Sequence, residues 1–271
     1  MVIDAENFES FRFSAFILIF TFAFAFQLFV PFEKGSIKLI FRNWRVNLPL
    51  GILNAAIIGI ICGGCLVSLS IDQWSHGKSL VGQVTENSII QIAISILVLD
   101  FVAYIWHRLN HIIPFLWRFH ATHHSDSLID SSTAIRFHPG EVLISLGVRL
   151  LVVWVFGIPL IGLFVFEIVY MVFNFTEHSF IKLPASFEQK IQWLFITPAL
   201  HRWHHSVNWR EANSNYGTVF SFWDRLLNSL QSVSKIESFR VGLPEHQGET
   251  FGFFKSLSIP VREGNRKSSI S

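Results

Sequence analysis

Long apolar stretches are the feature that most constrains how this chain folds. Residues 13–32 and 46–71 carry no charge, and residues 87–106 carry only Asp100. Each is long enough to cross the roughly 30 Å hydrocarbon core of a bilayer as a helix. The bilayer interior cannot satisfy exposed backbone hydrogen bonds, so helices are the expected spanning form. The sequence therefore predicts an all-α fold, a polytopic membrane bundle.

A fourth apolar region, residues 142–176, is interrupted only by Arg149 and Glu167. It is too long for one crossing at about 1.5 Å per helical residue. Gly157-Ile158-Pro159 lies near its middle, and glycine followed by proline is typical of a bend. We therefore predict a helical hairpin with an even number of crossings.

Charge and composition agree with a membrane location. Only 15% of the residues are charged, whereas about a quarter is typical of soluble domains. The net charge of +2 gives no reason to expect nucleic acid as a partner. Four basic residues lie between the first two spans and predict that this loop is cytoplasmic, with the acidic N-terminus outside: Lys34, Lys38, Arg42 and Arg45.

The predicted organisation has three parts. Residues 1–90 hold N-terminal transmembrane helices, residues 91–230 form the main domain, and residues 231–271 form a polar, disordered tail. The first apolar stretch lacks a small-residue cleavage site, so we expect a retained helix rather than a signal peptide. Cys62 and Cys65 have no second pair, and we interpret them as small residues at a helix contact rather than a redox or zinc motif.

Histidine is concentrated in three short strings. Eight of the twelve histidines have spacings that place two or three imidazoles on one helix face. Imidazole suits iron, copper, zinc and nickel, and eight ligands exceed the needs of one ion, so the count favours two metals. The alternative is a set of structural or pH-sensing histidines. The three strings are His107 and His111; His120, His123 and His124; and His201, His204 and His205.

Further residues extend this candidate site. Asp100 shares a helix face with His107 and His111, and an ionisable group in a span predicts function, such as orienting a ligand. The alternative for Asp100 is a salt bridge with Arg149. Two metals need more ligands than the strings provide, so His178 and His138 are added. Glu177, and less strongly Glu141, are candidate carboxylate partners of the ligands.

The ordered motifs resemble the fatty acid hydroxylase/sterol desaturase superfamily across roughly residues 90–230. Besides the histidine strings, the likeness includes residues 100–104, 114–117 and 136–141, Glu177-His178-Ser179, Asn215-Tyr216-Gly217 and Trp223-Asp224-Arg225-Leu226. Phe180-Ile181-Lys182 carries no further histidine, which leaves the tenth ligand open between His138 and others. Leu227-Asn228-Ser229 also departs from the expected pattern, which puts only a local turn in doubt.

The resemblance implies a non-haem di-iron oxygenase in a histidine-rich helical cap on the cytoplasmic face. It would use two iron ions, dioxygen and electrons from a separate electron-transfer protein or reductase to hydroxylate or desaturate a lipid taken from the bilayer. The eight string histidines and His178 would be ligands, and Asn215 and Asp224 supporting residues. The modest length and the missing organelle signal favour a bacterial inner membrane.

Two other classes compete with this interpretation. A metal transporter would use the histidines as a conduit, but its ligands should lie at mid-membrane depth and be reachable from both sides. A zinc hydrolase would need an open zinc position and a general base, and no His-Glu-x-x-His motif occurs.

Overall fold

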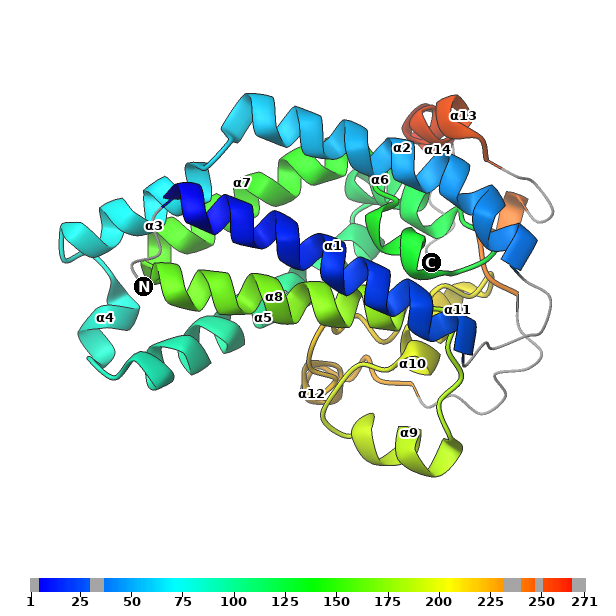
Figure 1. Ribbon diagram of the computed structural model, residues 1–271. Coiled ribbons are helices and arrows are strands. Elements are labelled where there is room, and N and C mark those ends of the chain that lie inside the picture. The colour runs from blue at the N-terminus through cyan, green and yellow to red at the C-terminus, as the bar shows by residue number, and fades with distance from the viewer. Residues whose placement is uncertain (1–4, 30–36, 232–239, 247–250, 265–271) are drawn as a thin grey trace.

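Five long helices form the body of the protein. The computed structural model describes residues 5–29, 37–231, 240–246 and 251–264. The long helices run alongside one another in Figure 1, and each contains a segment apolar and long enough to cross a membrane. Within the described ranges no strand occurs beyond two isolated bridges. The chain is thus an all-α integral membrane protein, as predicted. The helices are α1 (Ala5–Phe29), α2 (Ile37–Cys62), α5 (Ser88–Ile112), α7 (Pro139–Phe156) and α8 (Leu160–Glu177).

Helices α7 and α8 form the predicted hairpin. The chain reverses at Gly157, whose φ of 57° suits glycine. Ser70 Oγ donates a hydrogen bond of 2.7 Å to the Ile158 carbonyl, and Ser79 Oγ binds the Gly157 carbonyl. A Cβ at Gly157 would lie 2.3 Å from Ser79 Cα. The turn therefore depends on glycine both for its backbone angle and for its close contact with Ser79.

The second span differs from its predicted bounds. It begins at Ile37 rather than residue 46 and ends at Cys62 rather than residue 71. Gly64, with a φ of 77°, separates it from α3 (Cys65–Ser75). Because the chain turns there, Cys62 and Cys65 approach to a Cα–Cα distance of 5.3 Å and form a disulfide. The interpretation of these cysteines as small residues at a helix contact was wrong.

Shorter helices gather at the two ends of the bundle (Figure 1). Helix α3 and α4 (Leu80–Val84) lie at one end. The other end, which we call the histidine end, holds most of the remaining elements, and it contains every histidine string. They are α6 (Pro114–His124), η1 (Ser131–Ile135), α9 (Ala185–Ile191), α10 (Pro198–His204), α11 (Trp209–Ala212), α12 (Phe222–Leu226), η2 (Pro244–His246), α13 (Phe253–Leu257) and α14 (Ile259–Gly264).

Helix α8 packs closely against α5 and α1. Helices α5 and α8 approach so closely that a Cβ at Gly162 would lie 2.2 Å from Ser95 Oγ. Helix α1 packs on α8 through Phe16 and Phe20, whose rings lie 5.4 and 5.3 Å from the ring of Phe175. The Gly162–Ser95 contact joins the starts of α8 and α5, and both helices carry their histidines at their other ends.

Part of the predicted disordered tail is folded. Residues 251–264 form α13 and α14, where Phe251 and Ile259 are buried against Trp117 and Ala121 of α6. Their apolar side chains explain why this segment packs rather than remaining in solvent. The prediction of disorder is wrong for these residues, while residues 265–271 lie outside the described ranges.

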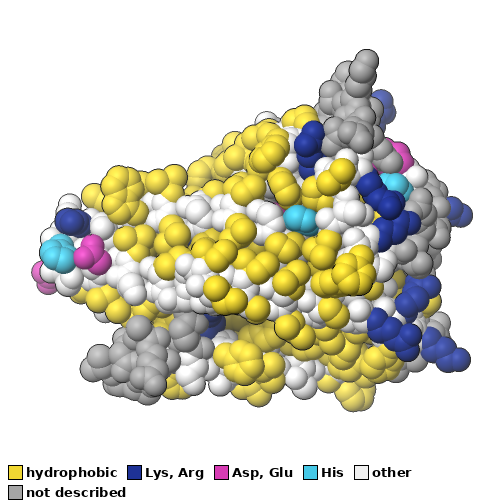
Figure 2. Space-filling view, turned by 90° about the horizontal axis from the view of Figure 1, so that it is seen from above, with side chains coloured by type: hydrophobic (Ala, Val, Ile, Leu, Met, Phe, Trp, Pro, Cys, Tyr) yellow, Lys and Arg dark blue, Asp and Glu magenta, His cyan; other side chains and the backbone are white. Residues whose placement is uncertain are grey.

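Basic side chains are concentrated at the histidine end. Figure 2 shows Lys and Arg side chains gathered around that end, with wide apolar surface along the bundle. Lys38, Arg42 and Arg45 lie on the first turns of α2, which contact η1 beside the histidines. Lys34, the fourth basic residue of that loop, lies outside the described ranges.

Candidate metal centre

The first two histidine strings come from a helix end and the helix that follows. His107 and His111 lie on the last turns of α5, which ends before Pro114, the first residue of α6. Proline suits this position because the first turn of a helix has no use for its missing N–H. Helix α6 then carries His120, His123 and His124 on its last turn and a half.

The remaining histidines come from α8 and α10. His178 is the residue that caps the C-terminus of α8. Helix α10 begins directly after its capping residue Thr197, whose side-chain oxygen accepts a hydrogen bond from the Leu200 N–H at 3.3 Å. This cap fixes the start of the short helix that carries His201 and His204, with His205 immediately after it.

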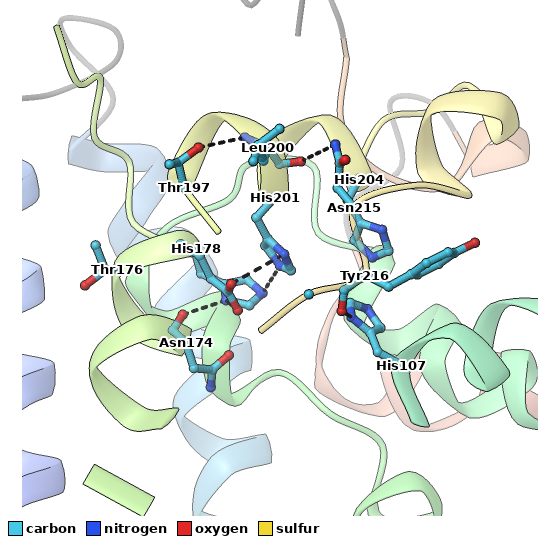
Figure 3. A network of polar contacts seen from close by, with 12 residues as sticks. His107, Asn174, Thr176, His178, Thr197, Leu200, His201, His204, Asn215 and Tyr216 are labelled. Atoms are coloured by element: carbon cyan, nitrogen blue, oxygen red, sulfur yellow. Dashed lines mark hydrogen bonds and ion pairs between the residues drawn. The ribbon is translucent and has the colours of Figure 1, made fainter. Parts of the chain in front are cut away.

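Nine histidines converge into two groups. Within each group, one nitrogen from every residue lies within 4.8 Å of those of the other members. Figure 3 shows His178 and His201 pointing toward each other, with His107 and His204 beside the Tyr216 backbone. The five-histidine group comprises His107, His111, His120, His124 and His204, and the four-histidine group comprises His123, His178, His201 and His205.

Three imidazoles of the five-histidine group are fixed by hydrogen bonds at Nδ1, the nitrogen that faces away from the other histidines. The His107 Nδ1–H donates to the Tyr216 carbonyl at 2.9 Å, and the His204 Nδ1–H to the Ser214 carbonyl at 2.8 Å. His120 Nδ1 lies 2.8 Å from Glu141 Oε1. A carbonyl accepts only from an N–H, so the Nε2 of His107 and His204 carries the lone pair.

The inner nitrogens of this group fit a metal ion. All five Nε2 atoms are buried and have no hydrogen-bond partner among the described residues. Buried polar atoms are normally satisfied, so this concentration calls for a missing partner. Neutral imidazoles with Nδ1 bound to a carbonyl or carboxylate are the usual form of histidine ligands. The donor set therefore suits a transition metal.

The four-histidine group is drawn together more tightly. His178 Nε2 lies 3.0 Å from His123 Nε2 and 2.8 Å from His201 Nε2, and His205 Nε2 lies 3.1 Å from His201 Nε2. Only His178 has its outer nitrogen fixed by a hydrogen bond to a carbonyl, that of Asn174 at 2.7 Å. This group also presents Nε2 atoms to a common point, as metal ligands do.

Burial favours the neutral form of several histidines that lie outside the spans. Loss of solvation lowers the pKa of His178 and of His204 to about 3. Burial, together with neighbouring imidazoles, lowers the pKa of His123, His124 and His205 well below the ordinary value. Because a protonated imidazole has no lone pair for a metal, the buried centre favours the ligand form.

Asp100 contacts a loop rather than an imidazole. It accepts hydrogen bonds from the N–H groups of Val219 and Phe220 and from Trp223 Nε1, at 3.0, 3.2 and 2.8 Å. The structure gives it neither the histidine contact nor the Arg149 salt bridge that we expected. It anchors the loop whose Tyr216 carbonyl orients His107, so its effect on that ligand is indirect.

Asn215 and Asp224 also support this loop. Asp224 accepts hydrogen bonds from the N–H groups of Tyr216 and Gly217 at 2.8 and 2.7 Å. Asn215, at a φ of 55°, donates to the Leu200 carbonyl of α10 at 3.2 Å. Ser229, in the departing Leu-Asn-Ser segment, donates to Asp224 at 2.7 Å. Sequence motifs indicated Asn215 and Asp224, but the orienting carbonyls of Tyr216, Ser214 and Asn174 carry no side-chain signal.

His138 lies apart from the histidine groups, whereas Glu177 lies beside one of them. His138 belongs to neither group: it caps the start of α7, where its Nδ1 accepts from the Gly140 N–H at 3.0 Å. It is therefore not placed as a ligand, because its position before Pro139 commits it to the helix start. Glu177 is buried, with carboxylate oxygens 3.8 Å from the Nδ1 atoms of His178 and His201.

A cavity of about 860 Å³ reaches from the histidines into the bundle. His107, His123 and His201 line one end of it, and its walls come mainly from apolar side chains of α1, α2, α5, α7 and α8. The centre is thus open toward a space that suits a lipid chain rather than a polar solute.

The fold and the centre define a class, that of polytopic membrane proteins with clustered histidines able to bind metal ions. Residues 92–229 match the fatty acid hydroxylase family. The chain belongs to this family.

Characterised relatives are similar over part of their length. Ornithine lipid hydroxylase OlsE from Rhizobium tropici is 29% identical over 180 residues, covering 66% of this chain and 53% of that protein. Human alkylglycerol monooxygenase is 30% identical over 140 residues, covering 50% and 29%. Human cholesterol 25-hydroxylase is 28% identical over 147 residues, covering 53% and 52%. The chain thus spans about half or less of these relatives. No solved structure matches it.

Proposed function

We propose that this protein is a di-iron oxygenase that inserts oxygen into a C–H bond of a membrane lipid. The observation that carries the proposal is the pairing of nine clustered histidines, eight of them buried, with an apolar cavity between the spans. Membership of the fatty acid hydroxylase family supports it. The relatives named above are hydroxylases and monooxygenases, which favours hydroxylation over desaturation.

The histidines and the cavity walls would have different roles in this reaction. The five- and four-histidine groups would each hold one iron, and iron supplies the oxidising power that amino-acid side chains lack. One oxygen atom of dioxygen would enter the C–H bond, and the other would leave as water after taking up two electrons and two protons. The electrons would come from a separate electron-transfer protein. The cavity walls would exclude water and position the lipid chain against the centre.

The proposed orientation places the histidine end in the cytoplasm. The basic side chains gathered at that end, including Lys38, Arg42 and Arg45, satisfy the positive-inside rule. A cytoplasmic centre would be accessible to a soluble or peripheral electron donor. The location in a bacterial inner membrane stays a prediction from the sequence.

The transporter alternative is not favoured. All nine histidines lie at one end of the spans, whereas transport ligands are expected near the middle and accessible from both sides. Family membership also points to oxygenation rather than transport.

Metal analysis and isotope labelling test the proposal. The purified protein in lipid nanodiscs should contain two irons per chain. With a reductant and ¹⁸O₂, a lipid product should gain one labelled oxygen atom. His76→Ala, an exposed histidine at the opposite end, is the control and should behave as wild type. Zinc in place of iron, or lipid oxidation without label from dioxygen, would overturn it.

A further inference from the structure

The cavity contains a second polar site far from the histidines. Arg149 of α7 and Glu167 of α8 both line it, and Arg149 Nη1 donates to Glu167 Oε1 at 3.0 Å. The Arg149 guanidinium also lies over the Tyr170 ring, 5.1 Å from its centroid. Charged groups within membrane spans are costly and usually serve function. A salt bridge that only joined α7 and α8 would not need both of its side chains to line a cavity.

Helix geometry gives the distance between this pair and the metal centre. Arg149 lies eight residues after Glu141, which contacts His120, and Glu167 lies ten residues before Glu177, beside His178. At 1.5 Å per residue these separations are about 12 and 15 Å along the two helices. The two separations are therefore similar, and both place the pair close to the middle of the spans.

The cavity also opens toward the bilayer. Phe13 of α1 and Ile52 of α2 line it, yet they are 67% and 70% exposed. Apolar side chains that face both a cavity and the outside mark a lateral opening between these helices. A lipid would thus reach the Arg149–Glu167 pair and the histidines without leaving the membrane.

The charges of the pair define the chemistry that it would recognise. Two arginines, Arg12 and Arg149, line the cavity beside the single carboxylate of Glu167. Arg12 Nη1 forms an ion pair with Glu167 Oε2 at 3.9 Å, which is too long for a hydrogen bond, so this oxygen can still accept one. A hydroxyl group can donate to this carboxylate while accepting from the guanidinium. An alkane can do neither, and an ionised carboxylate can accept from the guanidinium but has no proton to donate to Glu167.

We propose that the Arg149–Glu167 pair binds the hydroxyl group of the lipid substrate. The lipid is then an apolar alcohol whose oxidised carbon lies about 12 to 15 Å from its hydroxyl. The substrate role rests on the oxygenase function proposed above, whereas recognition of the hydroxyl does not. The pair sets which lipids bind and which carbon reaches the histidines.

Binding of matched probes tests this assignment. Full-length, metal-loaded protein in phosphatidylcholine nanodiscs is titrated with 1-tetradecanol, tetradecane and tetradecanoate, without reductant so that no turnover occurs. Wild type should bind the alcohol at least tenfold more tightly than the alkane or the carboxylate. The R149L/E167L variant, in which neither charge is left unpaired, should bind alcohol and alkane equally. D72N, an exposed carboxylate at the opposite end, should keep the preference.

The outcomes separate binding from chemistry. A preference for the alcohol that survives in R149L/E167L, no preference in wild type, or tighter binding of the carboxylate would each overturn the proposal. If the double variant does not fold, E167Q serves instead, and an alcohol preference undiminished there would overturn it equally. Because no turnover is measured, failure here leaves the oxygenase function standing, and a failed oxygenase assay leaves the binding result intact.

Discussion

The two histidine groups differ in how their ligands are held before any metal binds. In the five-histidine group, three outer nitrogens are fixed by Tyr216, Ser214 and Glu141, and the inner nitrogens have no hydrogen-bond partner in the described part of the chain. In the four-histidine group only His178 is fixed in this way, and the inner nitrogens contact one another. The first group is preorganised, whereas the second must separate its imidazoles to accept an ion. Preorganised sites bind more tightly for the same ligands.

Removing ligands from one group at a time should produce the largest effect. H124A/H204A and H123A/H205A should each reduce the metal content from two ions to one. Product formation should fall more than about a hundredfold in both, beyond the loss typical of outer partners. Metal analysis by mass spectrometry measures this, with H76A as control. Loss of both metals from either variant would contradict independent groups.

Acid should destabilise the metal-free protein strongly. The folded-state pKa of His178 and of His204 is about 3, against about 6.5 in an unfolded chain. The unfolded chain therefore binds more protons between these values, and stability falls as the pH drops through that window. Each such histidine should cost about 1.4 kcal/mol between pH 7.5 and 5.5.

Chemical denaturation of chelator-treated protein at several pH values measures this slope. H123Q/H205Q removes two buried histidines from the less constrained group and should make the slope shallower. Bound metal should suppress the slope, because coordinated imidazoles do not take up protons. A free energy of unfolding that does not change with pH would show that the imidazoles are not buried together.

Substitution of Glu141 tests whether preorganisation raises the metal affinity of the five-histidine group. E141Q keeps the shape of the side chain but removes the charge that orients His120. The metal affinity of the five-histidine group should fall 10- to 100-fold, the usual cost of losing an outer partner. Affinity at the four-histidine group should be unchanged. Competition with a graded chelator series measures both, with the exposed Glu86→Gln as control. Equal weakening of both groups would contradict the distinction between them.

Asp100 reaches the same group through the 216–223 loop. D100N cannot accept all three hydrogen bonds that the carboxylate accepts, because an amide nitrogen only donates. We expect a loss of about 1 to 3 kcal/mol in the free energy of unfolding. Thermal unfolding measures it, and D72N is the matched exposed control. The accompanying loss of metal affinity should be confined to the five-histidine group.

His138 should give the smallest effect. H138A removes the side chain that caps α7 and should cost about 1 kcal/mol of stability. Metal content should remain at two ions, and H138N should restore stability because asparagine also caps helix starts. Loss of a metal ion from H138A would return this histidine to the ligand set.

Local spacing predicted the spans and most of the histidines that converge, but not how these histidines are grouped. His123 and His124 are adjacent, and successive helical residues point about 100° apart, so they enter different groups. The partners that complete each group lie many residues away, where spacing carries no information. Asp100 shows the same limit, since its acceptor contacts are with a loop more than a hundred residues along the chain. His138 was different: the following proline already indicated a helix start.

The positions of the ligands along the chain also fix the order in which the protein can mature. The five-histidine group needs His204, and the four-histidine group needs His201 and His205, although five other histidines of these groups are made about 80 to 100 residues earlier. During synthesis, every span is therefore complete before either group is. If each group binds a metal ion as proposed, neither ion can gain its full ligand set until all five spans have been synthesised.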